Sequence, residues 1–125
     1  MLEVSIKKIE IIALNPIIEA AKKEGLGFCK NTVLYGCFLD NEIIGFTGIL
    51  WFKNKAVFKN HFVLPKYRRN KIFTKMLIFC IDIVKIRQVK LIEANCFASS
   101  ISAYLALGGK IVKTFNNCKR IHIYL

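Results

Sequence analysis

The sequence predicts an α/β (α+β) domain built on a mixed, mostly antiparallel twisted sheet with helices on both faces. Three apolar runs separated by short turns fill residues 32–64, which is typical of an antiparallel meander. A helix-period segment then leads to another apolar run, as in a βαβ unit. The 125 residues are enough for one hydrophobic core, so we expect a single domain over residues 1–125.

The first half of the chain predicts one strand, one helix and the meander. Residues 4–12 are apolar and partly alternating, so a first strand is expected there. Asn15 and Pro16 are expected to begin a helix as N-cap and first helical residue, and Gly25 or Gly27 is expected to end it. The predicted meander strands are 32–39, 42–52 and 55–64, with turns at Asp40–Asn41 and Lys53–Asn54.

The second half predicts a helix, a strand, a short helix and a closing hairpin. The helix covers 72–85, and the apolar run 89–94 reads as a buried strand parallel to the third meander strand. A helix over 99–107 is closed by Gly108–Gly109, and the final strands are 110–115 and 119–125. Gly45 and Gly48, inside the second meander strand, indicate a bulge or the close approach of another backbone.

The charge distribution favours anionic partners. The formal net charge is +12, and no acidic residue occurs between Glu42 and Asp82. Such a chain attracts nucleic acid, phosphorylated cofactors and acidic protein surfaces, although the lysines also fit a simple compositional bias. The cations of the acid-free window are Lys53, Lys55, Lys59, Lys66, Arg68, Arg69, Lys71 and Lys75.

Composition also bears on the compartment. No apolar run reaches the roughly 18 residues that a membrane span needs, and the first residues lack the layout of a signal peptide. The five cysteines are scattered without a C-x-x-C pair, which argues against a zinc site or a disulfide framework. We therefore expect a soluble, cytoplasmic protein with free thiols and no membrane partner.

A basic loop joins the meander to the following helix. Phe62–Leu64 ends a strand, Pro65 stops it, Lys66–Lys71 is cationic, and Ile72 begins the helix. Free backbone N–H groups and the helix dipole favour an anion at such a helix N-terminus, and the cations favour a phosphate-bearing ligand. The same stretch also fits a basic surface turn between two core elements.

Two motifs within this element order resemble the GNAT superfamily of N-acetyltransferases. The first is Val63-x-Pro65-x-Tyr67-Arg68 followed by a helix containing Met76-Leu77, which is similar to the family's acetyl-CoA signature. The second is Ser100-x-x-x-Tyr104-x-x-Leu107-Gly108, which is similar to the family's next helix and its closing glycine. Together with the strand order, the resemblance covers nearly the whole chain.

The resemblance implies acetyl-CoA as co-substrate and assigns roles to particular residues. Backbone groups of Phe62 and Val63 are expected to pair with the pantetheine arm, which lies between the third meander strand and the next strand. Tyr104 occupies the position of the general acid that protonates the departing thiolate; the alternative is a core aromatic with a satisfied hydroxyl. The remaining cofactor-binding residues, around the pyrophosphate, are Arg68, Arg69, Asn70, Lys71, Ile72, Phe73 and Thr74.

Three positions depart from the family pattern. Lys71 and Phe73 replace small residues that let the backbone approach phosphate closely. A direct contact of the Lys71 ammonium with phosphate offsets the first change, and rotation of Phe73 into the core offsets the second. Phe97 replaces an asparagine that often begins the second motif.

The general base is open on the sequence alone. The third meander strand carries no carboxylate, and His61 is its one side chain that titrates near neutral pH. His61 either acts as the base or merely covers a sheet face. Glu93 is a lesser candidate, and no base is needed if the amine arrives neutral.

Two functions remain in view. The first is an acetyl-CoA-dependent N-acetyltransferase in which the amine attacks the thioester directly. The short region before the meander hints at an open acceptor site, completed by a macromolecular acceptor or by a second subunit of a homodimer. The alternative is a catalytically inactive GNAT-fold module whose basic face binds nucleic acid or an acidic protein.

Overall fold

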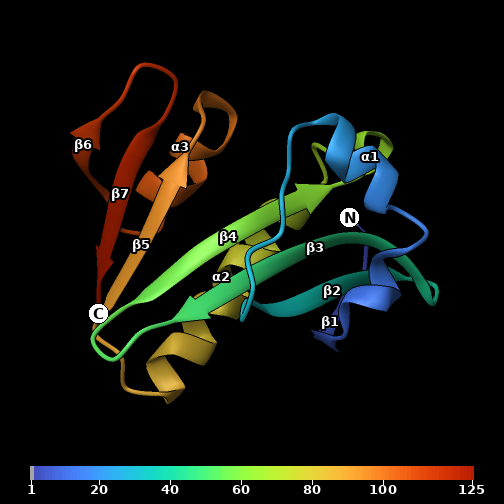
Figure 1. Cartoon of the computed structure of the whole chain (residues 1–125), viewed down its shortest axis with the longest axis horizontal. Coiled ribbons are helices and arrows are strands. Elements are labelled where there is room, and N and C mark those ends of the chain that lie inside the picture. Colours follow the sequence, from blue (N-terminus) through green and yellow to red (C-terminus); the bar gives the residue numbers. More distant parts are fainter. Residues whose placement is uncertain (1) are drawn as a thin grey trace.

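The computed structural model describes residues 2–125, so the first residue of the expected domain lies outside the described part. Seven strands form one sheet in the order β1-β2-β3-β4-β5-β7-β6, with helices on both faces (Figure 1). The α/β class and the predicted order of elements are confirmed. The elements are β1 (Ser5–Ile9), η1 (Ile11–Leu14), α1 (Ile18–Lys23), β2 (Val33–Leu39), β3 (Glu42–Trp51), β4 (Ala56–Val63), η2 (Pro65–Tyr67), α2 (Ile72–Ile86), β5 (Leu91–Cys96), α3 (Ala98–Ala106), β6 (Lys110–Thr114) and β7 (Lys119–Tyr124).

The meander forms as the turn residues require. Asp40 and Asn41 both have positive φ, 49° and 70°, which is the conformation of a two-residue hairpin turn. β2, β3 and β4 pair antiparallel in sequence order. Each strand is one or two residues shorter than predicted, because the flanking residues belong to turns.

The first helix begins later than the sequence indicated. Asn15 ends the 3-10 turn η1 instead of capping a helix, and the N-cap of α1 is Ile17. Leu14 and Ile17 are both buried against the sheet, so packing of these two side chains sets the turn geometry in place of the Asn-Pro cap. Gly25 ends α1 with φ 83°, as predicted.

The strand after α2 is also displaced from its predicted range of 89–94. The N–H of Val89 bonds to the carbonyl of Val84, and Gln88 has φ 62°, so residues 88–90 close the helix before the strand starts at Leu91. β5 lies parallel to β4, as the βαβ argument predicted. The expected glycine closure of α3 is confirmed, with Gly108 at φ 93°.

The two faces of the sheet are covered unequally. α2 and α3 pack on one face over the whole β3–β4–β5–β7 region, where Leu77, Val84 and Tyr104 meet the buried residues of the strands. On the other face, η1 and α1 cover only β2, β3 and the end of β4. Figure 1 shows this second face of β5, β7 and β6 without a helix in front of it.

The pairing of β4 with β5 is short. Only Ala56, Val57 and Phe58 pair with β5, and beyond them the two strands separate. Across β3, the register shifts between Phe46 and Gly48, so β4 carries a bulge at Asn60, whose φ is 60°. The bulge or close approach expected in β3 from its glycines is also present: against β2 the register shifts between Cys37 and Phe38, which leaves Ile44, next to Gly45, as an extra residue of β3.

Gly45 and Gly48 of β3 allow neighbouring atoms to lie closer to the strand than any side chain would permit. A Cβ built on Gly45 would lie 2.6 Å from the carbonyl oxygen of Phe62, and one on Gly48 would lie 2.6 Å from the Cγ2 of Thr32. No helix within residues 2–125 is both long and apolar enough to cross a membrane.

Candidate functional site in the splay between β4 and β5

A cavity of about 840 Å³ occupies the splay between β4 and β5. Its walls come from four places: the second half of β4, the end of β5, the loop and first turn of α2, and α3. Residues 24–27, which follow α1, close one side. The cavity thus gathers almost every residue that the sequence nominated, although these are distant along the chain.

The loop before α2 has an unusual backbone. Arg69 and Lys71 both adopt left-handed conformations, with φ 69° and 61°, and Lys71 is the N-cap of α2. The side-chain amide of Asn70 donates to the carbonyls of Tyr67 and Arg68, which holds the turn. The first turn of α2 contains no acidic residue, so its free N–H groups face the cavity mouth with a positive dipole.

Arg68 ties this loop to two other segments. Its Nε donates to the carbonyl oxygen of Val63 at 2.8 Å, and its terminal nitrogen lies 2.7 Å from both carboxylate oxygens of Glu24. The guanidinium also lies over the Phe62 ring. Arg68 therefore joins the end of β4 to the end of α1, a contact across 44 positions of sequence that no local motif indicated.

The backbone groups of Phe62 and Val63 face opposite sides of β4. The N–H of Leu64 bonds to the carbonyl of Ile44, and Gly45 lies opposite Val63. In an antiparallel ladder this places the polar groups of Val63 away from β3, toward the splay, and those of Phe62 toward β3. Val63 is accordingly the better placed of the two residues for pairing with a ligand in the splay.

Phe73 lies in the position that the sequence argument required of it. The ring is partly buried and packs against the α2–sheet core, 5.2 Å from the His61 ring and 6.2 Å from the Tyr104 ring. Ile72, beside it, is buried in the core, and both Ile72 and Thr74 line the cavity. The Phe73 ring therefore packs against the core and also forms part of the cavity wall.

Tyr104 lines the cavity from α3 and is 1% exposed. Its hydroxyl has no hydrogen-bond partner within residues 2–125, and the same holds for the side-chain amide nitrogen of Asn60 at the bulge. Burial raises the pKa of Tyr104 well above 10, and the neighbouring Cys96 and Cys80 thiols add to the rise. The phenol is therefore protonated throughout the neutral range, and two buried donors lack partners in one cavity.

His61 reaches the same cavity from β4, next to the bulge. It shares a hydrogen bond through Nδ1 with the hydroxyl of Thr47, which is fully buried and which the sequence argument did not single out. Burial lowers the pKa of His61 to about 4, so the ring is neutral at pH 7. It lies on the α2 side of the sheet, with Phe58 and Tyr104 as aromatic neighbours.

Glu93 lies on the opposite, uncovered face of the sheet. Its carboxylate is 3.0 Å from Nε2 of His122 and 3.4 Å from Nζ of Lys55. Partial burial acts to raise the pKa of Glu93, but the hydrogen bond from His122 and the charge of Lys55 outweigh it, so the pKa is lowered. Glu93 and His61 are thus separate candidates on the two faces of the sheet.

A comparison with protein-family models supports the resemblance. The model described as the acetyltransferase (GNAT) family matches residues 12–108, which is most of the chain. No curated protein sequence matches the chain.

Solved structures show the same fold at low sequence identity. The PaiA N-acetyltransferase from Thermoplasma acidophilum, in complex with coenzyme A, is 18% identical, with a TM-score of 0.84 over 99% of this chain and 100% of that one. The ribosomal-protein-S18-alanine N-acetyltransferase from Escherichia coli is 16% identical, with a TM-score of 0.76 over 98% and 94% of the two chains. A GNAT family acetyltransferase from Elizabethkingia anophelis with acetyl-CoA bound is 18% identical, with a TM-score of 0.72 over 98% of each chain.

Proposed function

Since this chain belongs to the acetyltransferase (GNAT) family, we propose that it is an enzyme that transfers an acetyl group from acetyl-CoA to an amine by direct attack. The observation that carries this proposal is the cavity between β4 and β5, where two buried polar groups, the Tyr104 hydroxyl and the Asn60 amide, have no partner among the described residues. Buried donors are almost always satisfied, so both groups point to a ligand in the splay.

In the proposed complex, acetyl-CoA lies along the cavity in one direction. The α2 N-terminus, with Arg69 and Lys71 beside it, is the natural site for the pyrophosphate of acetyl-CoA. The pantetheine arm then runs along β4, where the polar backbone groups of Val63 face the splay. This places the thioester near the Asn60 bulge and within the part of the cavity that Tyr104 lines.

Tyr104 is the proposed proton donor to the leaving thiolate. Attack of the amine nitrogen on the thioester carbonyl forms the amide and breaks the carbon–sulfur bond, leaving a negative charge on sulfur. A phenol that burial keeps protonated donates a hydrogen bond to this charge as it develops and then gives its proton to the sulfur, after which the phenolate takes a proton back from solvent. The amine proton leaves either to solvent or to a base, for which His61 and Glu93 are the proposed candidates.

His61 has the chemistry of a weak base. Because its pKa is about 4, the imidazole is free to accept a proton at any pH above about 5 but holds it weakly. A rate controlled by His61 would show no inflection near its ordinary pKa of 6.5. The increase of the rate with pH then follows the deprotonation of the acceptor amine, which must be neutral to attack the thioester.

The test is a transfer assay read by mass spectrometry of the acceptor. Thiol reagents are unsuitable, because Cys29 is exposed and free. A panel of free amines is incubated with acetyl-CoA, and wild type is compared with Tyr104→Phe. Acetylation by wild type, reduced in the variant while acetyl-CoA still binds, supports the proposal; binding of acetyl-CoA without transfer to any amine would refute catalysis.

A further inference from the structure

The sheet face opposite α2 and α3 carries two ordered rows of side chains. Val57, Glu93, His122 and Lys110 lie opposite one another across β4, β5, β7 and β6. The next row consists of Asn95, Arg120 and Lys113. The alternate residues of β4, β5 and β7 point into the α2–α3 core, so the two rows share the face that no helix covers (Figure 1).

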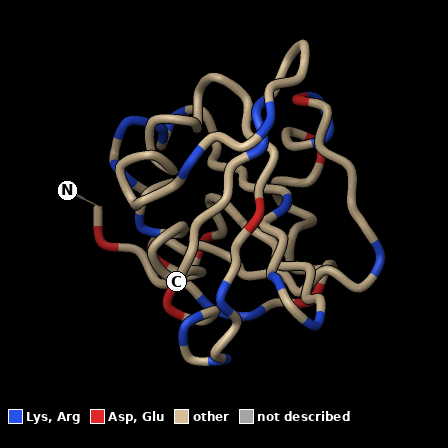
Figure 2. Tube along the Cα trace, turned by 90° about the vertical axis from the view of Figure 1, so that its left-hand side faces the viewer, with Lys and Arg blue, Asp and Glu red and all other residues tan. Residues whose placement is uncertain are grey.

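Among the described residues, the Lys and Arg side chains on the strands of this face form no ion pair. Glu93 is the one acidic residue in the four strands, and it already contacts both Lys55 and His122. Figure 2 looks toward the β6 edge of the sheet and shows Lys and Arg positions in blue on this side of the molecule, with Asp and Glu positions in red among them. Within residues 2–125, no carboxylate lies within 4.0 Å of Lys59, Lys110, Lys113 or Arg120.

Two of these cations are held in place by neutral groups. Nε of Arg120 donates to the side-chain oxygen of Asn95 at 3.1 Å, and the guanidinium lies 5.3 Å from the centre of the Phe115 ring. Nζ of Lys113 lies 5.0 Å from the centre of the same ring. A pair of positive charges held around one aromatic ring suits an anionic partner, because the carboxylate that acts on Arg120, Glu93, lies beyond 4.0 Å and already pairs with Lys55 and His122.

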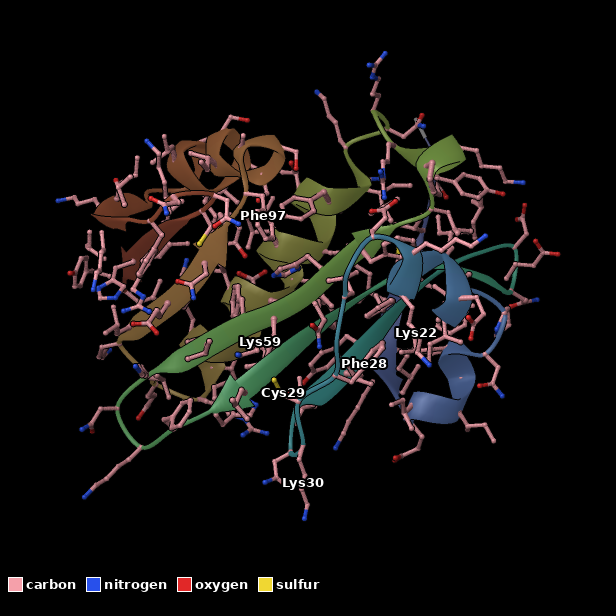
Figure 3. The ribbon with its side chains drawn as sticks, turned by 45° about the horizontal axis from the view of Figure 1, so that its top comes forward. Lys22, Phe28, Cys29, Lys30, Lys59 and Phe97 are labelled. Atoms are coloured by element: carbon pink, nitrogen blue, oxygen red, sulfur yellow. The ribbon has the colours of Figure 1, made fainter. Side chains whose placement is uncertain are left out.

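The face leads directly to the cavity. Val57, Lys59 and Asn95 belong to the uncovered face, and all three also line the cavity between β4 and β5. Phe97, which is 61% exposed, lines it too. Figure 3 shows Lys59 and Phe97 on either side of this opening, with the segment that carries Phe28, Cys29 and Lys30 in front of the sheet.

We propose that this uncovered face binds an acidic segment of a polypeptide acceptor, whose amine reaches the thioester through the opening between Lys59 and Phe97. The proposal rests on the acetyltransferase function proposed above and names its substrate class. Charge complementarity selects an anionic acceptor, and the chemistry selects a polypeptide: a terminal or lysine amine is a good nucleophile, whereas the exocyclic amines of nucleobases are conjugated with their rings and attack thioesters poorly.

The size of the face sets the length of the probe. Four strands about 4.8 Å apart span roughly 14 Å, which about five extended residues cover. The probe is therefore a peptide of about eight residues with a free N-terminal amine, followed by Asp and Glu, and with a fluorophore at its C-terminus. The matched peptide has Asn and Gln at the acidic positions, and a single-stranded oligonucleotide of similar length tests nucleic acid.

Binding is measured by fluorescence anisotropy at low and high salt, for wild type and two charge-reversed variants. Lys113→Glu/Arg120→Glu alters the proposed face. Lys8→Glu/Lys85→Glu makes the same change in net charge at exposed positions on β1 and α2, away from this face. We expect the acidic peptide to bind in a salt-dependent manner, with a loss of about tenfold or more in the first variant and less than about twofold in the second.

Each other outcome has a definite meaning. Equal binding of the amide peptide, equal weakening by both variants, or no peptide binding at low salt overturns the proposal, and binding of the oligonucleotide alone overturns it in favour of nucleic acid. The acetylated peptide is then quantified by mass spectrometry, where the acidic peptide should react faster than its amide counterpart. A separate titration with acetyl-CoA distinguishes failure of the donor site from failure of this acceptor surface.

Discussion

Replacing Lys71 by glycine is expected to stabilise the fold and weaken the binding of acetyl-CoA. Lys71 has φ 61° and ψ 19°, a left-handed conformation that costs an L-residue about 1–2 kcal/mol and glycine almost nothing. Glycine loses about 0.5–1 kcal/mol more backbone entropy on folding, so the net gain is roughly 0.5–1 kcal/mol. For a domain of this size, the gain corresponds to a rise in Tm of about 2–4 °C.

The loss of affinity follows from the ammonium group. Lys71 lines the cavity mouth at the α2 N-terminus, where it meets the pyrophosphate of the proposed donor. An exposed ammonium–phosphate contact contributes about 1 kcal/mol, so Lys71→Gly should weaken binding roughly fivefold. If the backbone alone held the phosphates, as the usual small residue of the family would permit, the same change should tighten binding instead.

Two control variants separate the two effects. Gln88→Gly relieves a similar left-handed residue, φ 62°, at the other end of α2 and should raise Tm without changing the affinity for acetyl-CoA. Lys71→Met keeps the Cβ and removes the charge, so it should weaken binding as much as glycine does. Calorimetric titration and thermal unfolding of the four proteins are the assays. Tighter binding by Lys71→Gly would refute the assignment of Lys71 to phosphate.

Three further predictions concern the buried and paired groups of the site. Tyr104→Phe should lower kcat roughly 100-fold or more with little effect on the affinity for acetyl-CoA. It should also raise the free energy of unfolding by about 1 kcal/mol, because it removes a buried hydroxyl without a partner. An unchanged kcat in the transfer assay would exclude the proton-donor role. The folded-state pKa of His61, about 4, lies below its unfolded value of about 6.5. Between these two pH values the unfolded chain binds more protons than the folded one, so the free energy of unfolding falls as the pH drops from about 6.5 to about 4. Urea unfolding should therefore show that wild type loses roughly 2–3 kcal/mol more than His61→Asn between pH 7 and 4.5; equal losses would contradict the burial argument. Glu24→Gln should change the free energy of unfolding by less than about 0.5 kcal/mol, since the ion pair between Arg68 and Glu24 is exposed. The same change should strengthen acetyl-CoA binding by roughly two- to fivefold, because it frees Arg68 to contact phosphate. Unchanged affinity by calorimetry would show that Arg68 only links the end of β4 to the end of α1.

Local chemistry made most of the fold predictable. The Asp40–Asn41 turn, the strand stop at Pro65 and the positive-φ closures at Gly25 and Gly108 all depend on the residue itself and its nearest neighbours. The helix start at Asn15–Pro16 was wrong because the burial of Leu14 and Ile17 overrides the local cap.

The site was predictable where a motif carried it. The sequence motif nominated Tyr104 and the loop 68–74, and all of these except Asn70 line the cavity. The bulge at Asn60, the hydrogen bond of Thr47 to His61 and the ion pair of Arg68 with Glu24 depend on which strands and helices meet in space. Gly45 and Gly48 indicated the bulge and the close approaches in β3, whereas no local signal indicated the second bulge, at Asn60 of β4.

The measurement that tests the central claim most directly is calorimetric titration of the protein with acetyl-CoA at moderate salt. The claim is that the splay between β4 and β5 binds acetyl-CoA. We predict one site per chain with micromolar affinity, weakened in Lys71→Met and unchanged in Lys8→Glu, which lies away from the cavity. Absence of binding, or equal binding by Lys71→Met and wild type, would contradict the account.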